Sequence, residues 1–278
     1  MLTPFDSSQG LHIMDIHTGQ HGGGNAPEQM TADFRADRPL RMEIEAIGRI
    51  LAAIETGTMT CLEIGIPNPV GSLSLRRLGG YWTAVGWTLE QCRGTAALLQ
   101  EEVLQAGANS ELPFDDKQFD VVVVARGHLT GNPDRDVALV QECHRVLKTP
   151  GYLVISGDYR KRVNLAGLFA RRTAEAGGYN EKQIFDLLKT GFDVLGVRTY
   201  CRFWVQVMRH LLDAPGRGKG GATALLYWLA SQLDALLFFT KGYQIIAYGR
   251  RKGWRERQPL GVRHGLRIGE AVLSRARI

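Results

Sequence analysis

The segment Cys61-Leu-Glu-Ile-Gly-Ile-Pro-Asn-Pro-Val-Gly-Ser72 has the residue types of a loop that binds a nucleotide cofactor, together with two unusual prolines. Glycine lacks a Cβ atom, so Gly65 can adopt positive φ and let a ligand approach the main chain. Pro67 and Pro69 fix φ and remove two amide donors. We therefore expect a ligand-binding turn that is stiffer and poorer in N–H groups than a glycine-rich loop.

Three further residues have side chains that could move a proton or bind a polar group. His128 follows a run of four valines, and Asp158 and Tyr159 follow a second apolar run. Histidine is suited to general base catalysis because its pKa lies near neutral pH. His128 is the first candidate base, and the alternative is that it only hydrogen-bonds its own loop. Asp158 and Tyr159 are second candidates, with a turn residue and a rim aromatic as the alternatives.

These side chains would be positioned by strands that alternate with helices. Phe119–Ala125 and Tyr152–Ser156 are rich in β-branched residues, and Val137–Leu147 between them has helical spacing. An earlier helix is expected to begin at Asp37 and to end at Gly57. The predicted strands are Thr60–Ile64, Trp82–Gly86, Glu102–Gln105, Phe119–Ala125, Tyr152–Ser156, Phe192–Thr199 and Tyr243–Gly249.

This alternation predicts an α/β fold with a Rossmann-like, doubly wound, mostly parallel seven-stranded sheet. A helical insert is expected before the last strand. In open sheets of this kind, ligands bind beyond the carboxyl ends of the strands. That edge would bring together Gly65–Gly71, Trp87, Ala108–Glu111 and Arg126–His128.

Three motifs carry a resemblance to a known family. They are Glu63-Ile-Gly65, then Glu111-Leu-Pro-Phe-Asp-Asp-Lys-Gln-Phe-Asp-Val-Val-Val-Val124, then His144-Arg-Val-Leu-Lys-Thr-Pro-Gly-Tyr-Leu-Val-Ile-Ser156. In this order and spacing the chain resembles a class I S-adenosylmethionine-dependent methyltransferase of the methyltransferase-11/UbiE-like group, over about residues 40 to 250. The resemblance implies the class I fold, S-adenosylmethionine as cofactor and methyl transfer to an acceptor, which we expect to be small or lipid-like.

The resemblance also implies which positions would hold the cofactor. Glu63 and Gly65 match the opening of the family's glycine loop, and Arg126 and His128 lie where members place residues that face cofactor and substrate. The family's ribose-binding carboxylate falls at Trp87. Its adenine-binding carboxylate falls at Ala108, with Asn109 and Glu111 nearby.

The departures from the family pattern leave two hypotheses. In the first, an active enzyme has a remodelled cofactor site, in which Trp87 stacks on the adenine and Asn68 and the Gly71-Ser72 amides replace groups lost at the prolines. In the second, a protein with the methyltransferase fold has no catalytic activity and serves as a scaffold or a partner-binding subunit.

Composition fits a globular protein of 278 residues with 44% hydrophobic and 22% charged residues. The four cysteines form no paired motif, so reduced thiols and a cytoplasmic location are expected. The N-terminus lacks the pattern of a secretory signal. No metal site is predicted.

We expect a flexible N-terminal arm at residues 1–33, a methyltransferase-like domain at 34–250 and a basic tail at 251–278. The formal net charge of +6 is concentrated at the C-terminus, because Arg250 to Ile278 contain nine Lys/Arg and two Asp/Glu. A nearly neutral body argues against a nucleic-acid partner. The tail could contact an anionic membrane or be a solvated extension.

The insert at 201–241 contains two apolar helical patterns. It could cover the crevice, form a homodimer or protein-partner face, pack as ordinary core, or attach the chain to a membrane surface. A cover this apolar would suit a lipid-like acceptor. The uninterrupted apolar stretch is too short to span a bilayer.

Overall fold

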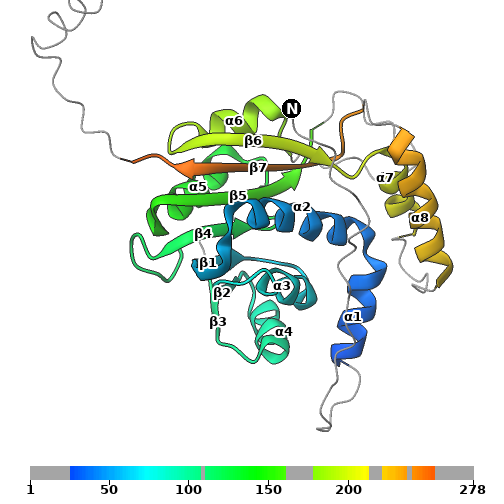
Figure 1. Cartoon of the computed structure of the whole chain (residues 1–278), viewed down its shortest axis with the longest axis horizontal. Helices are drawn as coiled ribbons and strands as arrows, with labels where there is room; N and C mark the ends of the chain where they lie inside the picture. Colours follow the sequence, from blue (N-terminus) through cyan, green and yellow to red (C-terminus); the bar gives the residue numbers. More distant parts are fainter. Residues whose placement is uncertain (1–25, 108–109, 161–177, 213–220, 237–239, 254–278) are drawn as a thin grey trace, which may run out of the picture.

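The computed structural model describes residues 26–107, 110–160, 178–212, 221–236 and 240–253. A seven-stranded sheet in the order β3-β2-β1-β4-β5-β7-β6 forms its centre (Figure 1). Strand β7 runs antiparallel to β5 and β6, and the other neighbouring strands are parallel. The strands are β1 (Thr60–Ile64), β2 (Tyr81–Gly86), β3 (Val103–Gln105), β4 (Phe119–Val124), β5 (Leu147–Asp158), β6 (Phe192–Tyr200) and β7 (Gln244–Arg251). The predicted fold class is confirmed.

Helices cover both faces of the sheet and so divide the core into two layers. Helices α2 and α3 pack on one face, and α5 and α6 pack on the other. The helices are α1 (Ala26–Ala36), α2 (Arg38–Ile54), α3 (Pro69–Arg76), α4 (Leu89–Leu99), α5 (Pro133–Val146), α6 (Glu181–Leu188), α7 (Phe203–Leu212) and α8 (Gly221–Leu236), with a 3-10 turn at Thr56–Thr58.

The valine run of β4 explains why this strand lies in the middle of the sheet. All four residues from Val121 to Val124 are fully buried. Alternate side chains point to opposite faces, so Val121 and Val123 join the α2 layer while Val122 and Val124 join the α5 layer. A strand that is apolar on both faces can be buried only between two helical layers.

Helix α2 begins and ends near the residues predicted from its sequence. The Asp37 carboxylate accepts a hydrogen bond from the Leu40 amide at 2.9 Å and caps the helix. The last turn closes at Glu55, which adopts left-handed φ of 61°. Leu40 and Ile47 lie in the buried stripe, as predicted.

Two elements cross the predicted domain boundaries. Residues 26–33 do not belong to a structureless arm, because they form most of α1, whose Phe34 and Met30 pack into the α2 layer. The tail does not begin at residue 251, since Arg251 is the last residue of β7. The remaining arm and tail residues, 1–25 and 254–278, lie outside the described residues.

The helical insert is confirmed as α7 and α8, which pack on each other and lie beside the edge where the parallel strands end (Figure 1). Among the helices that the structure describes, none is long and apolar enough to cross a bilayer. In the same residues no group of three potential metal ligands occurs. All four cysteines are buried.

Candidate functional site

The turn after β1 brings His128 onto Gly65. Gly65 has φ of 68°, and His128 Nε2 lies 2.8 Å from the Gly65 carbonyl oxygen. A Cβ atom built on Gly65 would lie only 1.9 Å from His128 Nε2. The imidazole therefore occupies the space that a side chain at position 65 would need. A ligand that binds the Gly65 carbonyl must displace the Nε2–H donor of His128.

Trp87 completes an aromatic pair across the ends of three neighbouring strands. Its ring centroid lies 5.2 Å from that of His128, with the two planes tilted by 33°. Gln91 of α4 fixes the backbone on both sides, because its Oε1 accepts from the Trp87 amide and its Nε2 donates to the Ile66 carbonyl. The indole Nε1 is buried and has no hydrogen-bond partner among the described residues. Since an unpaired buried donor costs free energy, this N–H marks a position where a ligand acceptor would be stabilising.

The two prolines of the loop have different structural roles. Pro69 occupies the first turn of α3, and Asn68 caps that helix by accepting from the Val70 amide at 2.9 Å. Asn68 also donates to the Met30 carbonyl of α1, so both polar ends of its side chain are engaged within the protein. Pro67 is exposed.

The predicted replacement amide at Gly71 is also engaged, because it donates to the Asn68 carbonyl. Gly71 serves packing instead. A Cβ atom there would come within 3.2 Å of Ile44 on α2 and of Ile66. The glycine therefore lets α3 approach α2 closely.

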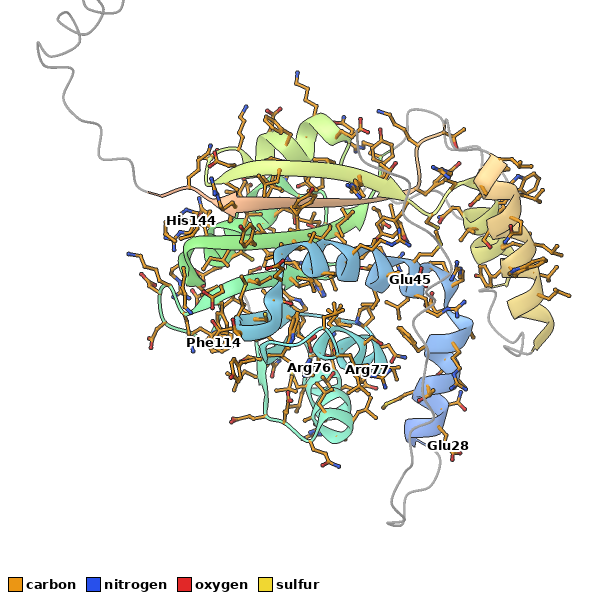
Figure 2. The ribbon with its side chains drawn as sticks, viewed as in Figure 1. Glu28, Glu45, Arg76, Arg77, Phe114 and His144 are labelled. Atoms are coloured by element: carbon orange, nitrogen blue, oxygen red, sulfur yellow. The ribbon has the colours of Figure 1, made fainter. Side chains whose placement is uncertain are left out.

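Glu63 faces α3 rather than the Trp87–His128 pair. Its carboxylate bonds Arg76 at 2.8 Å, and Arg76 also bonds Glu101 (Figure 2 labels Arg76). Burial raises the pKa of Glu63, and the Arg76 charge offsets part of that rise. This buried pair ties β1 to α3 and thereby sets the position of the loop between them.

The environment of His128 favours its neutral form. Burial lowers the pKa of the imidazole, the hydrogen bond to Gly65 opposes this, and the Arg135 charge lowers the pKa further. A neutral ring that donates from Nε2 carries its lone pair on Nδ1. His128 could therefore accept a proton at Nδ1 near pH 7.

The lowered pKa of His128 predicts a pH-dependent stability that a His128→Asn variant should lack. Between the native pKa and the ordinary value of 6.5, the unfolded chain binds a proton that the native chain does not bind. Stability should therefore fall as pH falls through this window. Urea unfolding at about pH 7.5 and about pH 5.5 should show a larger loss for the wild type than for His128→Asn. Equal losses would mean that His128 is not held neutral.

A second polar cluster lies on the α2 side of the sheet edge. Glu43 is fully buried and accepts hydrogen bonds from the Arg126 amide at 2.7 Å and from the Ser156 hydroxyl. The Arg126 Nε lies 3.4 Å from Glu43, and its Nη1 lies 3.9 Å from Asp158. Although burial lowers the pKa of Arg126, Glu43 and Asp158 raise it on balance, so the guanidinium is charged.

Two side chains beside this cluster have unpaired polar atoms. Gln244 of β7 is fully buried, and neither its Oε1 nor its Nε2 has a partner among the described residues. Tyr200 of β6 pairs with Gln244 in the sheet register, and its buried hydroxyl is likewise unpaired in the described part of the chain. Burial raises the pKa of Tyr200, so the phenol is neutral. Gln244 and Tyr200 thus offer hydrogen-bond donors and an acceptor to a ligand at this edge of the sheet.

Asp158 and Tyr159 lie on opposite faces of the sheet. The Asp158 carboxylate is 57% exposed beside Arg126, whereas Tyr159 packs with the α5 layer on the other face. Since neighbouring strand residues point to opposite faces, one turn cannot present both side chains to the same ligand.

Of the predicted cofactor residues, the structure brings Gly65 and Trp87 together, and it adds His128 to them. Arg126 lies instead with Glu43 and Asp158. Asn109 and the neighbouring Ala108 lie outside the described residues.

Sequence reasoning missed three residues that position the site. Glu43 occupies a core position of α2, three residues after Leu40 and four before Ile47, and this spacing could have identified it as buried. Asp136 is buried and accepts from Thr130 and from the Gly131 amide, which fixes the loop after His128. Gln91 carried no comparable signal.

Comparison with known families gives one match. Residues 62–155 match the family described as Methyltransferase domain, which is the part of the chain that holds Gly65, Trp87 and His128. Comparison with curated proteins gives no match.

Several solved structures have a similar fold. A chain from the complex between the Haloferax volcanii Trm112 methyltransferase activator and a candidate methyltransferase gives a TM-score of 0.52 at 14% identity, covering 81% of this chain and 97% of that one. The PH0226 protein from Pyrococcus horikoshii OT3 gives 0.51 at 15% identity, covering 78% and 93%. The [4+2]-cyclase SpnF gives 0.51 at 20% identity, covering 74% and 82%.

At these identities the solved structures establish the fold alone, and the cyclase among them is a reminder that one fold can serve several reactions. The methyltransferase match runs from β1 into β5 and so includes the residues of the candidate site. The family match over residues 62–155 and the seven-stranded sheet together support a methyltransferase-like domain with a Rossmann-like fold.

Proposed function

We propose that this protein transfers a methyl group from S-adenosylmethionine to a small or lipid-like acceptor, with a cofactor site rebuilt around Trp87 and His128. The observation that carries the proposal is the aromatic pair over Gly65, with ring centroids 5.2 Å apart. The pair lies beyond the carboxyl ends of β1, β2 and β4, which is the edge that doubly wound sheets use for ligands.

The residues around Gly65 could bind a nucleoside by stacking on the Trp87 and His128 rings and by a hydrogen bond from the Trp87 Nε1–H. Trp87 offers an indole face and a buried Nε1–H without a partner in the described residues. The amides at the start of α3 are engaged by Asn68, so they do not contribute to the fit. Trp87 and His128 would hold the cofactor, which supplies an activated methyl group on a sulfonium when it is bound.

The role of the protein in such a reaction is mainly to position the acceptor and to exclude water. His128 would remove the acceptor's proton at Nδ1, because its Nε2–H is committed to the Gly65 carbonyl at 2.8 Å. Asp136 would act through His128 as a positioning residue, since it fixes the loop that follows the histidine.

The acceptor would extend from His128 to the α2 side of the edge. Tyr200 and Gln244 offer unpaired donors and an acceptor, and α7 and α8 supply apolar walls that contact Tyr200. A molecule with a hydroxyl or carbonyl head and an apolar body matches this pairing of surfaces. Asp158, which is exposed at the rim beside Arg126, would face the same side.

One observation favours a second function. The His128 ring covers Gly65 so closely that it takes the space a cofactor would use to reach the main chain. If the His128 ring stays over Gly65 and keeps the cofactor out, the protein would be a non-catalytic methyltransferase-fold scaffold or a partner-binding subunit.

Calorimetric titration with S-adenosylhomocysteine tests the proposed function. We expect the wild type to bind, and Trp87→Phe to weaken binding by about two- to tenfold because it removes one hydrogen-bond donor but keeps an aromatic ring. Trp82→Phe is the matched control, since Trp82 Nε1 donates to the Gly79 carbonyl at 2.8 Å, at the other end of β2. The control should bind like the wild type.

Two results of this titration would contradict the proposal. A wild type that does not bind at saturating ligand would support the non-catalytic function. Equal affinities of wild type and Trp87→Phe would remove Trp87 from the cofactor site.

A further inference from the structure

Helix α8 exposes an unusually large apolar face. Six large side chains on it are between 42% and 70% exposed. They are Leu225, Leu226, Trp228, Leu229, Leu233 and Leu236. Contiguous exposed apolar surface of this kind marks a contact with a protein, a ligand or a membrane.

The two faces of α8 are reversed relative to an ordinary surface helix. Its one charged residue, Asp234, is only 5% exposed, because it accepts hydrogen bonds from the Trp204 and Val205 amides of α7. Tyr227 and Ala230 complete the buried face. The exposed half therefore carries no charge, whereas an ordinary surface helix is polar on its outer side.

Helix α6 provides an internal comparison. Its outer side also exposes one large apolar residue, Phe185, at 45%, but the exposed Lys182 and Asp186 lie beside it. A single apolar side chain among charges needs no partner. The absence of charge from the outer half of α8 is thus a property of that helix and not of every helix in the described chain.

The charges of the chain favour a bilayer as the partner of α8. Arg250 to Ile278 contain nine Lys/Arg and two Asp/Glu, so anionic lipid would attract this end of the chain, which follows α8 in the sequence. Two tryptophans, Trp204 at 37% and Trp228 at 56% exposure, lie on α7 and α8, and indole rings are preferred at membrane interfaces.

We propose that the exposed face of α8 inserts into the surface of an anionic phospholipid bilayer. The helix would lie in the plane of the interface with its leucines and Trp228 among the acyl chains, as amphipathic surface helices do. Anchoring there would hold α7 and the adjoining sheet edge next to the lipid. This proposal does not depend on methyl transfer, so either can fail alone.

Flotation of the full-length chain with vesicles tests the proposal. Vesicles of phosphatidylserine mixed with phosphatidylcholine should carry the wild type, and phosphatidylcholine alone should carry less of it. The variant Leu229→Glu plus Leu233→Glu should bind on the order of tenfold less, because it places two charges in the inserted face. The control is Phe185→Glu plus Leu195→Glu, which changes the charge equally at two other exposed positions. It should bind within about twofold of the wild type.

A second readout locates the contact. Brominated lipid should quench the tryptophan fluorescence of the wild type more strongly than that of Trp228→Phe. Far-ultraviolet circular dichroism and thermal melting confirm that each variant is folded.

Three results would overturn the proposal. The first is a wild-type chain that does not float with anionic vesicles. The second is equal flotation of the α8 variant and the wild type. The third is a wild-type dimer that the α8 substitutions dissociate, while neither the wild type nor any variant binds vesicles. The last result would assign the face to a second copy of the chain.

Discussion

Replacing Glu43 by leucine is expected to lower the free energy of unfolding by about 3–5 kcal/mol, since it removes the nearer carboxylate from the Arg126 charge and leaves only the exposed Asp158 at 3.9 Å. The Arg126 guanidinium would lose the carboxylate 3.4 Å away, and the Arg126 amide and the Ser156 hydroxyl would lose their acceptor. Urea unfolding measures the effect. Glu43→Gln should cost less, because it keeps an acceptor in the same place.

Glu45→Leu is the control for this substitution. Glu45 lies on the same helix, is 37% exposed and pairs with Arg38 at 3.5 Å (Figure 2). Exposed pairs of this kind contribute about 0–1 kcal/mol, so its loss should be small. Similar losses at positions 43 and 45 would show that the Glu43 cluster is not buried as described.

Replacing Gly65 by alanine is expected to cost more than about 2 kcal/mol, because strain and a steric clash act together. Left-handed φ costs a non-glycine residue about 1–2 kcal/mol, and the new Cβ would lie 1.9 Å from His128 Nε2. In a His128→Ala background only the φ strain remains. The same substitution should then cost about 1–2 kcal/mol.

A double-mutant cycle measures this coupling directly. Unfolding of the two single variants and of the double variant should give an interaction energy of about 1 kcal/mol or more between positions 65 and 128. Additive effects would contradict the close packing of His128 on Gly65.

The sheet could be predicted from the sequence because each strand has a strong local signal. Predicted and observed bounds agree for β1, and they differ by one to two residues for β2, β3, β4, β6 and β7. Strand β5 is longer than predicted, from Leu147 to Asp158, because its ends are held by pairing with β4 and β7 rather than by their own composition. Pairing partners are not visible in a local window.

The meeting of Gly65, Trp87 and His128 could also be predicted, since residues that follow parallel strands lie at one edge of the sheet. The partners of the polar side chains could not. Asn68 and Glu63 have residue types that suit a ligand, but the chain uses them to start α3 and to bind Arg76. Whether a polar group faces a ligand or its own fold depends on contacts between residues that are distant in the sequence.

Asn68-Pro69 could have been interpreted more fully. Asparagine followed by proline is a common helix start, and α3 begins at Pro69. Pro69, which the sequence predicts to stiffen a cofactor loop, therefore has a role in the fold, because it begins α3. The amide it removes is one that a helix start leaves unpaired in any case.

The central claim is that His128 and Trp87 hold the cofactor rather than occupy its place, and calorimetry of His128→Ala with S-adenosylhomocysteine tests this most directly. If His128 contacts the ligand, removal of its ring should weaken binding by about three- to tenfold. If the ring over Gly65 blocks the site, the same substitution should tighten binding or create it. Weaker binding is the predicted result, and tighter binding would contradict the account.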